Sequence, residues 1–333
     1  MTTPARSAAL RKVPVTILTG FLGAGKTTLL NRILRERHGE RIAVIENEFG
    51  EEGVDNDLII DSGAEQIIEM NSGCMCCTVR GDLVRILGEL RQRREAKPEA
   101  FDRVIIETTG LADPAPVAQT FFIDDDIAAY YALDAIVTIV DAKHAPQQLD
   151  DFHEAQEQVG FADRILLSKS ELISADELES LRGRLLRINP RAPVKPVHFG
   201  DTPISAIIDI GGFALDSILE IEPGFLGENH HEHDDAVQSF AFRSKRPLDA
   251  AKLQAFFRDL IATHARDLMR YKGVVAFAGL DHRVVFQGVH MMMGSDADRP
   301  WAADEVRESR LVFIGRNLPK DALIAQLQRC IAS

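Results

Sequence analysis

The feature that most constrains the fold is a glycine-rich segment at residues 20–27, GFLGAGKT, which matches the pattern G-x-x-x-x-G-K-[ST]. An apolar, β-rich run at 13–19 precedes it, and helical spacing of apolar residues begins at Lys26. A strand, a glycine-rich turn and a helix in this order are typical of phosphate-binding loops, because glycines let backbone N–H groups surround phosphate oxygens. We therefore expect an α/β domain of the P-loop NTPase class.

The loop predicts a specific set of nucleotide contacts. Lys26 is expected to reach the β- and γ-phosphates and Thr27 to bind Mg²⁺, while the N-terminus of the following helix adds N–H donors. A glycine-rich turn that contains Lys-Thr by chance is the alternative, and the flanking strand and helix disfavour it. The expected phosphate-binding residues are Gly20, Gly23, Ala24, Gly25, Lys26, Thr27 and Thr28.

A P-loop enzyme also needs a carboxylate at the end of a strand to hold Mg²⁺ or its water. Glu107 ends the apolar run at 103–107 and is our first choice, and Asp141, which ends the run at 135–140, is the alternative. Asp141 would otherwise serve as a helix N-cap or turn residue. Gly110 is expected to place a backbone N–H near the γ-phosphate. With Lys26 and Thr27, Glu107 completes the expected catalytic set.

Residues 168–171 indicate which base the nucleotide carries. In GTPases an N/T-K-x-D motif after a strand accepts two hydrogen bonds from guanine through its aspartate. This chain reads SKSE, so that Lys169 is kept and Glu171 replaces the aspartate with a side chain one methylene longer. We expect both residues to contact the base and GTP to be preferred, although the substitution leaves ATP open. A plain strand-to-helix loop is the alternative.

Apolar strands and amphipathic helices alternate over about the first 200 residues, which predicts βαβ units and a mostly parallel sheet. The strands are expected at 13–19, 41–46, 103–107, 135–140 and 164–168, and the helices from Lys26 and at 82–95, 115–122, 151–159 and 174–188.

A different pattern begins after residue 200. No Lys or Arg occurs between 201 and 242. Beyond that stretch, a strand at 237–243, a long helix at 247–269, strands at 270–278, 282–290 and 309–315 and a closing helix at 319–331 are expected. Three successive strands with no helix between them predict a small α+β domain with an antiparallel sheet. The expected organisation is a P-loop domain (1–207), an acidic His-containing linker (208–236) and a C-terminal domain (237–333).

Three of the four cysteines lie close together as Cys74, Cys76 and Cys77. Thiols this close can present soft ligands to Zn²⁺ or Cu(I). The cluster supplies three of the four ligands of a structural zinc site, and an open fourth position suits a site that loads and unloads metal. Buried, small hydrophobic cysteines are the alternative. The cluster His230-His231-Glu232-His233 could also gather divalent metal, or it could be a solvated loop.

The overall composition disfavours some classes of binding partner and indicates the cellular compartment. The formal net charge is −13, which disfavours binding to nucleic acid, since phosphate contacts need clustered Lys and Arg. No stretch has the length and apolar character of a membrane span, and the first twelve residues do not resemble a signal peptide. We therefore expect a cytoplasmic protein with reduced thiols. Its oligomeric state stays open, and a homo-oligomer is possible.

Together these motifs resemble the CobW-like metal-chaperone GTPases, which are related to the nickel-insertion GTPases of urease and hydrogenase. The resemblance covers about residues 13–330. It rests on GFLGAGKTTLLNRIL (20–34), IENEFGEEGVDNDLI (45–59), SGCMCCTVRGDL (72–83), ETTGLADPAPV (107–117), SKSEL (168–172), YKGVVAF (271–277) and SRLVFIG (309–315).

The resemblance implies a protein that binds and hydrolyses GTP with Mg²⁺ and delivers a transition metal, Zn²⁺ or Co²⁺, to a client metalloprotein. It places Glu46 and Glu48 in a switch-like segment after the second strand and adds them to the candidate metal residues, beside the three clustered cysteines. Two alternatives remain at this point: an ATP-dependent P-loop kinase or synthetase with an incidental thiol cluster, and a non-catalytic metal buffer.

Overall fold

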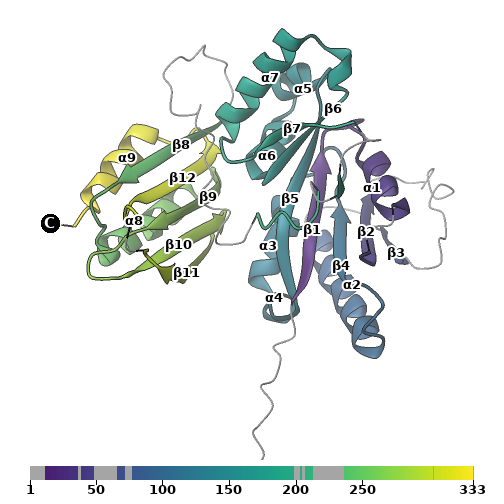
Figure 1. The fold of residues 1–333 in the computed structure, drawn as a ribbon, viewed down its shortest axis with the longest axis horizontal. Helices are drawn as coiled ribbons and strands as arrows, with labels where there is room; N and C mark the ends of the chain where they lie inside the picture. Colours follow the sequence, from purple (N-terminus) through teal and green to yellow (C-terminus); the bar gives the residue numbers. More distant parts are fainter. Residues whose placement is uncertain are drawn as a thin grey trace, which may run out of the picture.

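The computed structural model describes residues 12–36, 39–48, 66–71, 77–198, 203–204, 207–212, 236–302 and 304–332. Cys74, Cys76 and the His230–His233 cluster lie outside the described residues. Two β-sheets, each with its own helices, lie side by side (Figure 1). The predicted parallel sheet, followed by a small antiparallel domain, is confirmed.

The N-terminal domain is built on a seven-stranded sheet in the order β3-β2-β4-β1-β5-β6-β7, in which every pairing is parallel. Its central strands are buried almost throughout, as expected for apolar runs covered on both faces. The strands are β1 (Val13–Gly20), β2 (Ile42–Glu48), β3 (Gln66–Asn71), β4 (Arg103–Glu107), β5 (Tyr131–Asp141), β6 (Arg164–Ser168) and β7 (Val194–Pro196).

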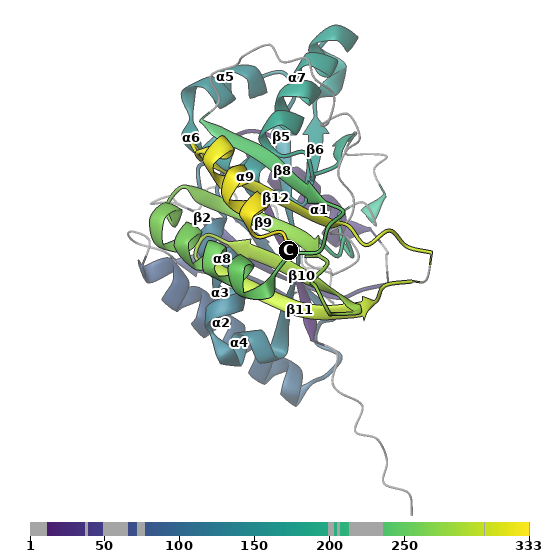
Figure 2. The same cartoon turned by 90° about the vertical axis from the view of Figure 1, so that its left-hand side faces the viewer.

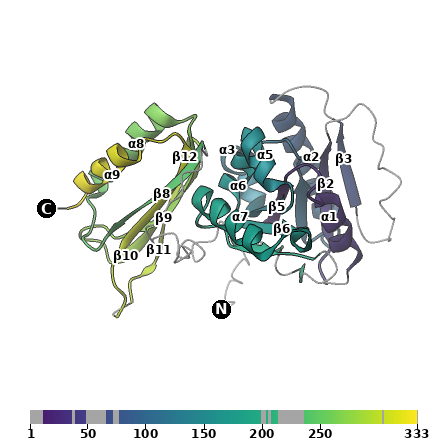
Figure 3. The same ribbon diagram turned by 90° about the horizontal axis from the view of Figure 1, so that it is seen from above.

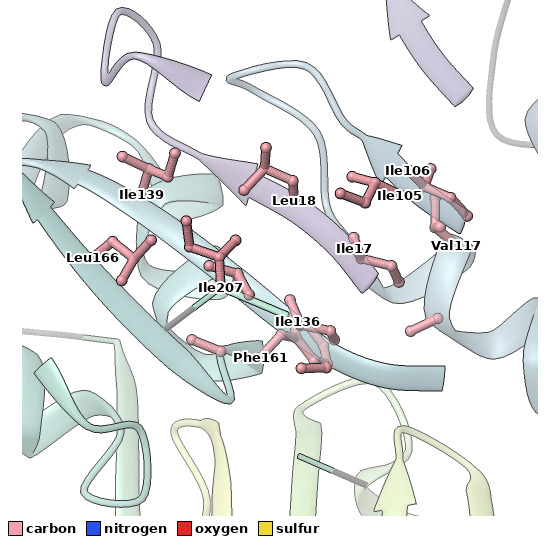
Figure 4. Close-up of a cluster of buried hydrophobic side chains, with 14 of the residues drawn as sticks. Ile17, Leu18, Ile105, Ile106, Val117, Ile136, Ile139, Phe161, Leu166 and Ile207 are labelled. Atoms are coloured by element: carbon pink, nitrogen blue, oxygen red, sulfur yellow. The ribbon is translucent and has the colours of Figure 1, made fainter. Parts of the chain in front are cut away.

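Helices flank this sheet (Figure 3). They are α1 (Lys26–Arg35), α2 (Cys77–Ala96), α3 (Ala115–Ile123), α4 (Asp125–Tyr130), α5 (Ala145–Asp151), α6 (His153–Phe161) and α7 (Ala175–Ile188), with a 3₁₀ turn, η2 (Ser170–Leu172). Ile17, Ile136 and Leu166 belong to the main core, together with Phe161 at the end of α6 (Figure 4). The core therefore fixes β1, β5, β6 and α6 relative to one another.

The C-terminal domain is an antiparallel sheet in the order β11-β10-β9-β12-β8. Its helices, α8 and α9, lie on the face turned away from the N-terminal domain (Figure 3). The elements are β8 (Val237–Ser244), α8 (Ala250–His264), β9 (Leu268–Val275), β10 (His282–Val289), β11 (Met292–Pro300), β12 (Ser309–Arg316) and α9 (Lys320–Arg329).

The sheet of the C-terminal domain is apolar on both faces. Along β12, Leu311 and Phe313 pack in the cluster that includes residues of α8 and α9, whereas Val312 and Ile314 belong to the core of the N-terminal domain. Gly160 of α6 permits this approach, since a Cβ there would lie 2.7 Å from Cε of Met269 in β9. One face of the C-terminal sheet therefore packs into the core of the N-terminal domain.

Several elements differ from the expectations. The long helix expected at 247–269 ends at His264, and β9 begins at Leu268, so the last part of the expected helix belongs to a turn and a strand. Strands β3 and β11 were not expected; both are edge strands, and β11 is largely polar, so neither carries the apolar pattern of a buried strand. The short elements β7, α4 and α5 were missed as well.

Candidate nucleotide-binding site

The turn between β1 and α1 needs glycine for steric reasons. Gly20 has φ 143°, and a Cβ at this position would lie 2.2 Å from the backbone oxygen of Ile139 in the neighbouring strand β5. Gly25, the N-cap of α1, has φ 95°. Both values lie in a region that residues with a Cβ rarely adopt. The sequence pattern of this loop thus follows from its backbone geometry.

Lys26 points back into the loop. Its Nζ donates hydrogen bonds to the backbone oxygens of Gly20, at 3.1 Å, and Phe21, at 3.2 Å, and its side chain is buried. Burial lowers the pKa of Lys26, and the negative charge of Glu107 opposes that effect. An ammonium group enclosed by a glycine-rich loop is suited to pair with a phosphate oxygen placed in the same loop.

Thr27 and Glu107 lie next to each other at the end of the sheet. The Thr27 hydroxyl donates a hydrogen bond of 3.1 Å to Oε1 of Glu107. The strands β1 and β4 pair in parallel, with Leu18 opposite Glu107, so the end of β4 meets the start of the loop. A hydroxyl and a carboxylate are oxygen ligands of the kind that Mg²⁺ prefers, and the residues present therefore fit this ion. Thr28 is exposed beside them.

Asp141, the alternative carboxylate, has other partners. It accepts a hydrogen bond of 2.7 Å from Nζ of Lys169, and its side chain lies 2.9 Å from Nδ1 of His144. Burial alone would raise the pKa of Asp141, but the hydrogen bonds from Lys169 and His144 outweigh it and the pKa is lowered. Asp141 therefore holds Lys169, and Glu107 is the carboxylate that lies beside Thr27.

Lys169 connects the expected base-binding segment to the phosphate loop. Its Nζ also donates to the backbone oxygen of Gly23 at 2.9 Å, and its backbone is left-handed, with φ 56°. The preceding Ser168 donates its hydroxyl to the backbone oxygen of Ala24 at 2.8 Å. These contacts fix the start of the SKSE segment against the loop. The sequence motif signalled Lys169, but it gave no sign of its pairing with Asp141.

Glu171 lies in η2 with an exposed side chain, and its Oε2 is 3.5 Å from Nδ1 of His198, just after β7. The ends of β6 and β7 thus bring together a carboxylate and an imidazole near Lys169. His198 was not among the expected site residues.

The segment after Glu107 lies against the phosphate loop. The backbone N–H of Thr108 donates to the oxygen of Leu18, and a Cβ on Gly110 would lie 2.7 Å from Cα of Leu22. Only glycine allows this approach without moving the backbone. Gly110 therefore lies directly against the phosphate loop.

The expected metal ligands are described only in part. Glu46 pairs in register with Glu107 across β2 and β4, and it therefore lies at the same edge of the sheet as the phosphate loop. The side chains of Glu48 and of Cys77, the first residue of α2, are not described. Across the described ranges, no group of three His, Cys, Asp or Glu side chains could hold a metal ion. The thiol segment itself falls largely outside those ranges.

Two family profiles match consecutive parts of the chain. Residues 14–196 match the CobW/HypB/UreG nucleotide-binding domain, and residues 237–331 match the cobalamin synthesis protein cobW C-terminal domain. The chain belongs to the CobW family. The matched ranges correspond to the parallel and the antiparallel sheets described above.

Two curated relatives match along more than nine-tenths of their length. The chain is 43% identical to "Zinc chaperone YjiA" of Escherichia coli over 95% of this chain and 98% of that protein. It is 35% identical to "Zinc chaperone CobW" of Pseudomonas aeruginosa over 97% of this chain and 92% of that protein.

A solved structure of a family member has the same fold. The zinc(II)-bound YjiA GTPase from E. coli superposes with a TM-score of 0.77 at 37% identity, covering 97% of this chain and all of that one. The fold of both domains is therefore that of a zinc-bound relative. Within the described residues, no helix has the length and apolar character needed to cross a bilayer.

Proposed function

We propose that this CobW-family protein binds and hydrolyses GTP and uses the nucleotide to control the delivery of a transition metal, Zn²⁺ in the first place, to a client metalloprotein. The observation that carries this proposal is the grouping of Lys26, Thr27 and Glu107 at one end of a parallel sheet, in a chain whose curated relatives are named zinc chaperones.

In this proposal each residue of the phosphate loop has a distinct role. Lys26 exchanges its backbone oxygen partners for the β- and γ-phosphates, and the N–H groups from Gly23 to Thr28 surround the phosphate oxygens. Thr27 and Glu107 would hold Mg²⁺, and the bound ion would supply positive charge next to the phosphates. The backbone of Gly110 faces the terminal phosphate.

Lys169 and Glu171 supply the preference for guanine. Lys169 is already held against the loop by Asp141 and Gly23, so its aliphatic stem can cover one face of the base. Glu171 accepts hydrogen bonds from the ring edge. Because its side chain is one methylene longer than that of Asp, the backbone at Glu171 must lie further from the base for the carboxylate to make the same hydrogen bonds.

Cys74, Cys76 and Cys77 bind the metal cargo as thiolates, and Glu46 and Glu48 lie in the segment that links this cargo site to the nucleotide. The register of Glu46 beside Glu107 supports this arrangement, because a change in the backbone of β2 at Glu46 reaches the Mg²⁺ ligand directly. We place the activity in the cytoplasm, where adjacent thiols stay reduced. We also propose that the chain is divided into a P-loop domain (1–207), a linker (208–236) and a C-terminal domain (237–333).

The test is a titration of Zn²⁺, Co²⁺ and Ni²⁺ into the full chain without nucleotide, with GDP and with a non-hydrolysable GTP analogue. We expect the metal affinity to change between nucleotide states by about 5- to 150-fold, the range of typical coupling energies, and metal to change nucleotide affinity by the same factor. Metal binding should release protons, because thiols must ionise to act as ligands.

The three cysteines of the 74–77 cluster are then replaced together by serine. This variant should hydrolyse GTP at the metal-free rate and ignore added Zn²⁺. Cys330→Ser is the matched control, since Cys330 is a buried free cysteine in the C-terminal domain. A wild-type response to Zn²⁺ in the triple variant would exclude the cluster as the metal-sensing site.

A further inference from the structure

A buried glutamine contacts the loop at 108–113, beside the phosphate loop. Gln158 of α6 is fully buried, and its Nε2 donates to the backbone oxygens of Gly110, at 3.2 Å, and Ala112, at 3.0 Å. Its Oε1 is also buried and has no hydrogen-bond partner in the part of the chain that the structure describes. The amide N–H groups of one side chain therefore bind two peptide groups of this loop, and the amide oxygen of the same side chain is left without a donor from the described residues.

The free acceptor matters because a glutamine amide carries both kinds of hydrogen-bonding group. In the arrangement seen here, the loop presents carbonyl oxygens to Gln158. If the peptide groups around Gly110 rotate, they present N–H groups instead, and Oε1 can accept them. A buried acceptor without a partner is unfavourable, so Gln158 favours an arrangement of the loop in which one peptide group supplies a donor to Oε1 while another keeps its carbonyl oxygen on Nε2. The same side chain can thus hold the loop in two arrangements.

The residues just before Gln158 contact the other domain. Oε1 of Gln156 accepts a hydrogen bond of 3.0 Å from the backbone N–H of Val237, at the start of β8, and Glu157 forms an ion pair with Arg316 at the end of β12. Positions two apart on a helix point to different sides. Helix α6 therefore faces the nucleotide-side loop with one residue and the C-terminal domain with its neighbours.

Helix α6 is firmly seated between these two surfaces. Thr138 of β5 donates its hydroxyl to the backbone oxygen of Gln158 at 2.8 Å, and Gly160 lies in close contact with Met269 of β9. Figure 2 shows the C-terminal sheet in front of the N-terminal domain, with α6 at its border. A displacement of α6 at Gln158 would therefore reach β8 and β12 through the contacts of Gln156 and Glu157.

We propose that Gln158 is a positioning residue that sets the loop at 108–113 for the terminal phosphate, and that α6 transmits the arrangement of this loop to the C-terminal domain. This rests on the GTPase function proposed above. When the terminal phosphate accepts an N–H from the loop, Gln158 holds the rotated peptide groups through Oε1. After hydrolysis, its Nε2 again holds the carbonyl groups.

The test uses the full chain and the variant Gln158→Leu, which keeps the side-chain size but removes both hydrogen-bonding groups. We expect the affinity for a GTP analogue relative to GDP to fall about fivefold or more, at the lower limit of typical coupling. The kcat for GTP hydrolysis should fall while the affinity for GDP stays close to that of the wild type. With the analogue bound, amide hydrogen exchange at 108–113 should be faster in the variant than in the wild type.

Gln156→Leu is the matched control, because it removes a buried amide from the same helix that does not touch the loop. It should leave exchange at 108–113 unchanged. Gln158→Asn, which keeps the amide but shortens its reach, should shift the nucleotide ratio in the same direction as Gln158→Leu, and it covers the case in which the leucine variant does not fold. In the wild type, exchange at 237–239 should differ between the GDP and analogue states.

The outcomes separate this inference from the proposed function. A wild-type nucleotide ratio in the Gln158 variants, equally fast loop exchange in Gln156→Leu, or no nucleotide effect at 237–239 in the wild type would overturn the inference. A wild-type protein that neither binds nor hydrolyses GTP would instead overturn the proposed function.

Discussion

Lys272 of β9 lies inside the interface between the two domains, and it is the group whose titration should show most clearly in the stability. Its Nζ donates a hydrogen bond of 2.7 Å to Asp163, which also pairs with Arg270, and a further one to the backbone oxygen of Gly212. Burial, reinforced by the positive charge of Arg270, lowers the pKa of Lys272 to about 7, although Asp163 acts in the opposite direction.

The lowered pKa makes the stability depend on pH in a defined direction. Between pH 7 and the ordinary lysine value of 10.5, the unfolded chain carries a proton on Lys272 that the folded chain lacks. Unfolding then takes up a proton, so the free energy of unfolding rises with pH by about 1.4 kcal/mol per pH unit from this group. Lys272→Met removes this contribution. From pH 7.5 to 9.5 the wild type should gain about 2.5 kcal/mol relative to the variant, because Lys272 of the folded chain is still partly protonated at pH 7.5.

The measurement is urea unfolding followed by the fluorescence of Trp301, the one tryptophan of the chain, which packs in the C-terminal domain with Val274. Both proteins are compared at several pH values and equal ionic strength, so that the titration of all other groups cancels in the difference. Lys320→Met, which removes an exposed lysine from the same domain, controls for the loss of one charge. If the free energies of the wild type and Lys272→Met run parallel from pH 7.5 to 9.5, Lys272 keeps its proton and the reasoning is wrong.

Two further predictions concern the nucleotide site. Lys26→Ala should abolish GTP hydrolysis while the circular dichroism spectrum stays that of the wild type, because the lysine charge acts on the phosphates; hydrolysis at the wild-type rate would remove the phosphate-loop assignment. Glu171→Asp should keep or tighten GTP binding, and Glu171→Ala should lower the ratio of GTP to ATP affinity, both measured by competition titration. An unchanged ratio in both Glu171 variants would mean that this residue does not recognise the base.

The sequence was sufficient for those parts of the fold in which one physical requirement dominates. A run such as the one in β1 is apolar because both faces of the strand are covered, and Gly20 is glycine because the oxygen of Ile139 occupies the space of a Cβ. Such requirements act on neighbouring residues, and they leave a local pattern. The parallel sheet, the phosphate loop and the position of Glu107 could therefore be predicted.

The contacts that the sequence could not predict join residues far apart in the chain. Asp141 ended an apolar strand just as Glu107 did, and only the pairing of β5 with β6 shows that it holds Lys169. Gln158 lies in an ordinary helical stretch, and nothing in its neighbourhood signals that it holds the loop after Glu107. The prediction of edge strands such as β11 failed for a different reason, since a polar strand with one neighbour has little hydrophobic pattern to detect.

Because both faces of β12 are buried, the two domains cannot be separated without exposing apolar surface. Val312 and Ile314 complete the core of the N-terminal domain, and Val237, Met269 and Val289 join them from β8, β9 and β10. Separated from its partner, the C-terminal domain would expose an apolar sheet face that has no helix of its own to cover it, and exposed faces of this kind favour aggregation. The C-terminal domain is thus no interchangeable module: a chimera that recombines domains between relatives must carry both sides of this face together.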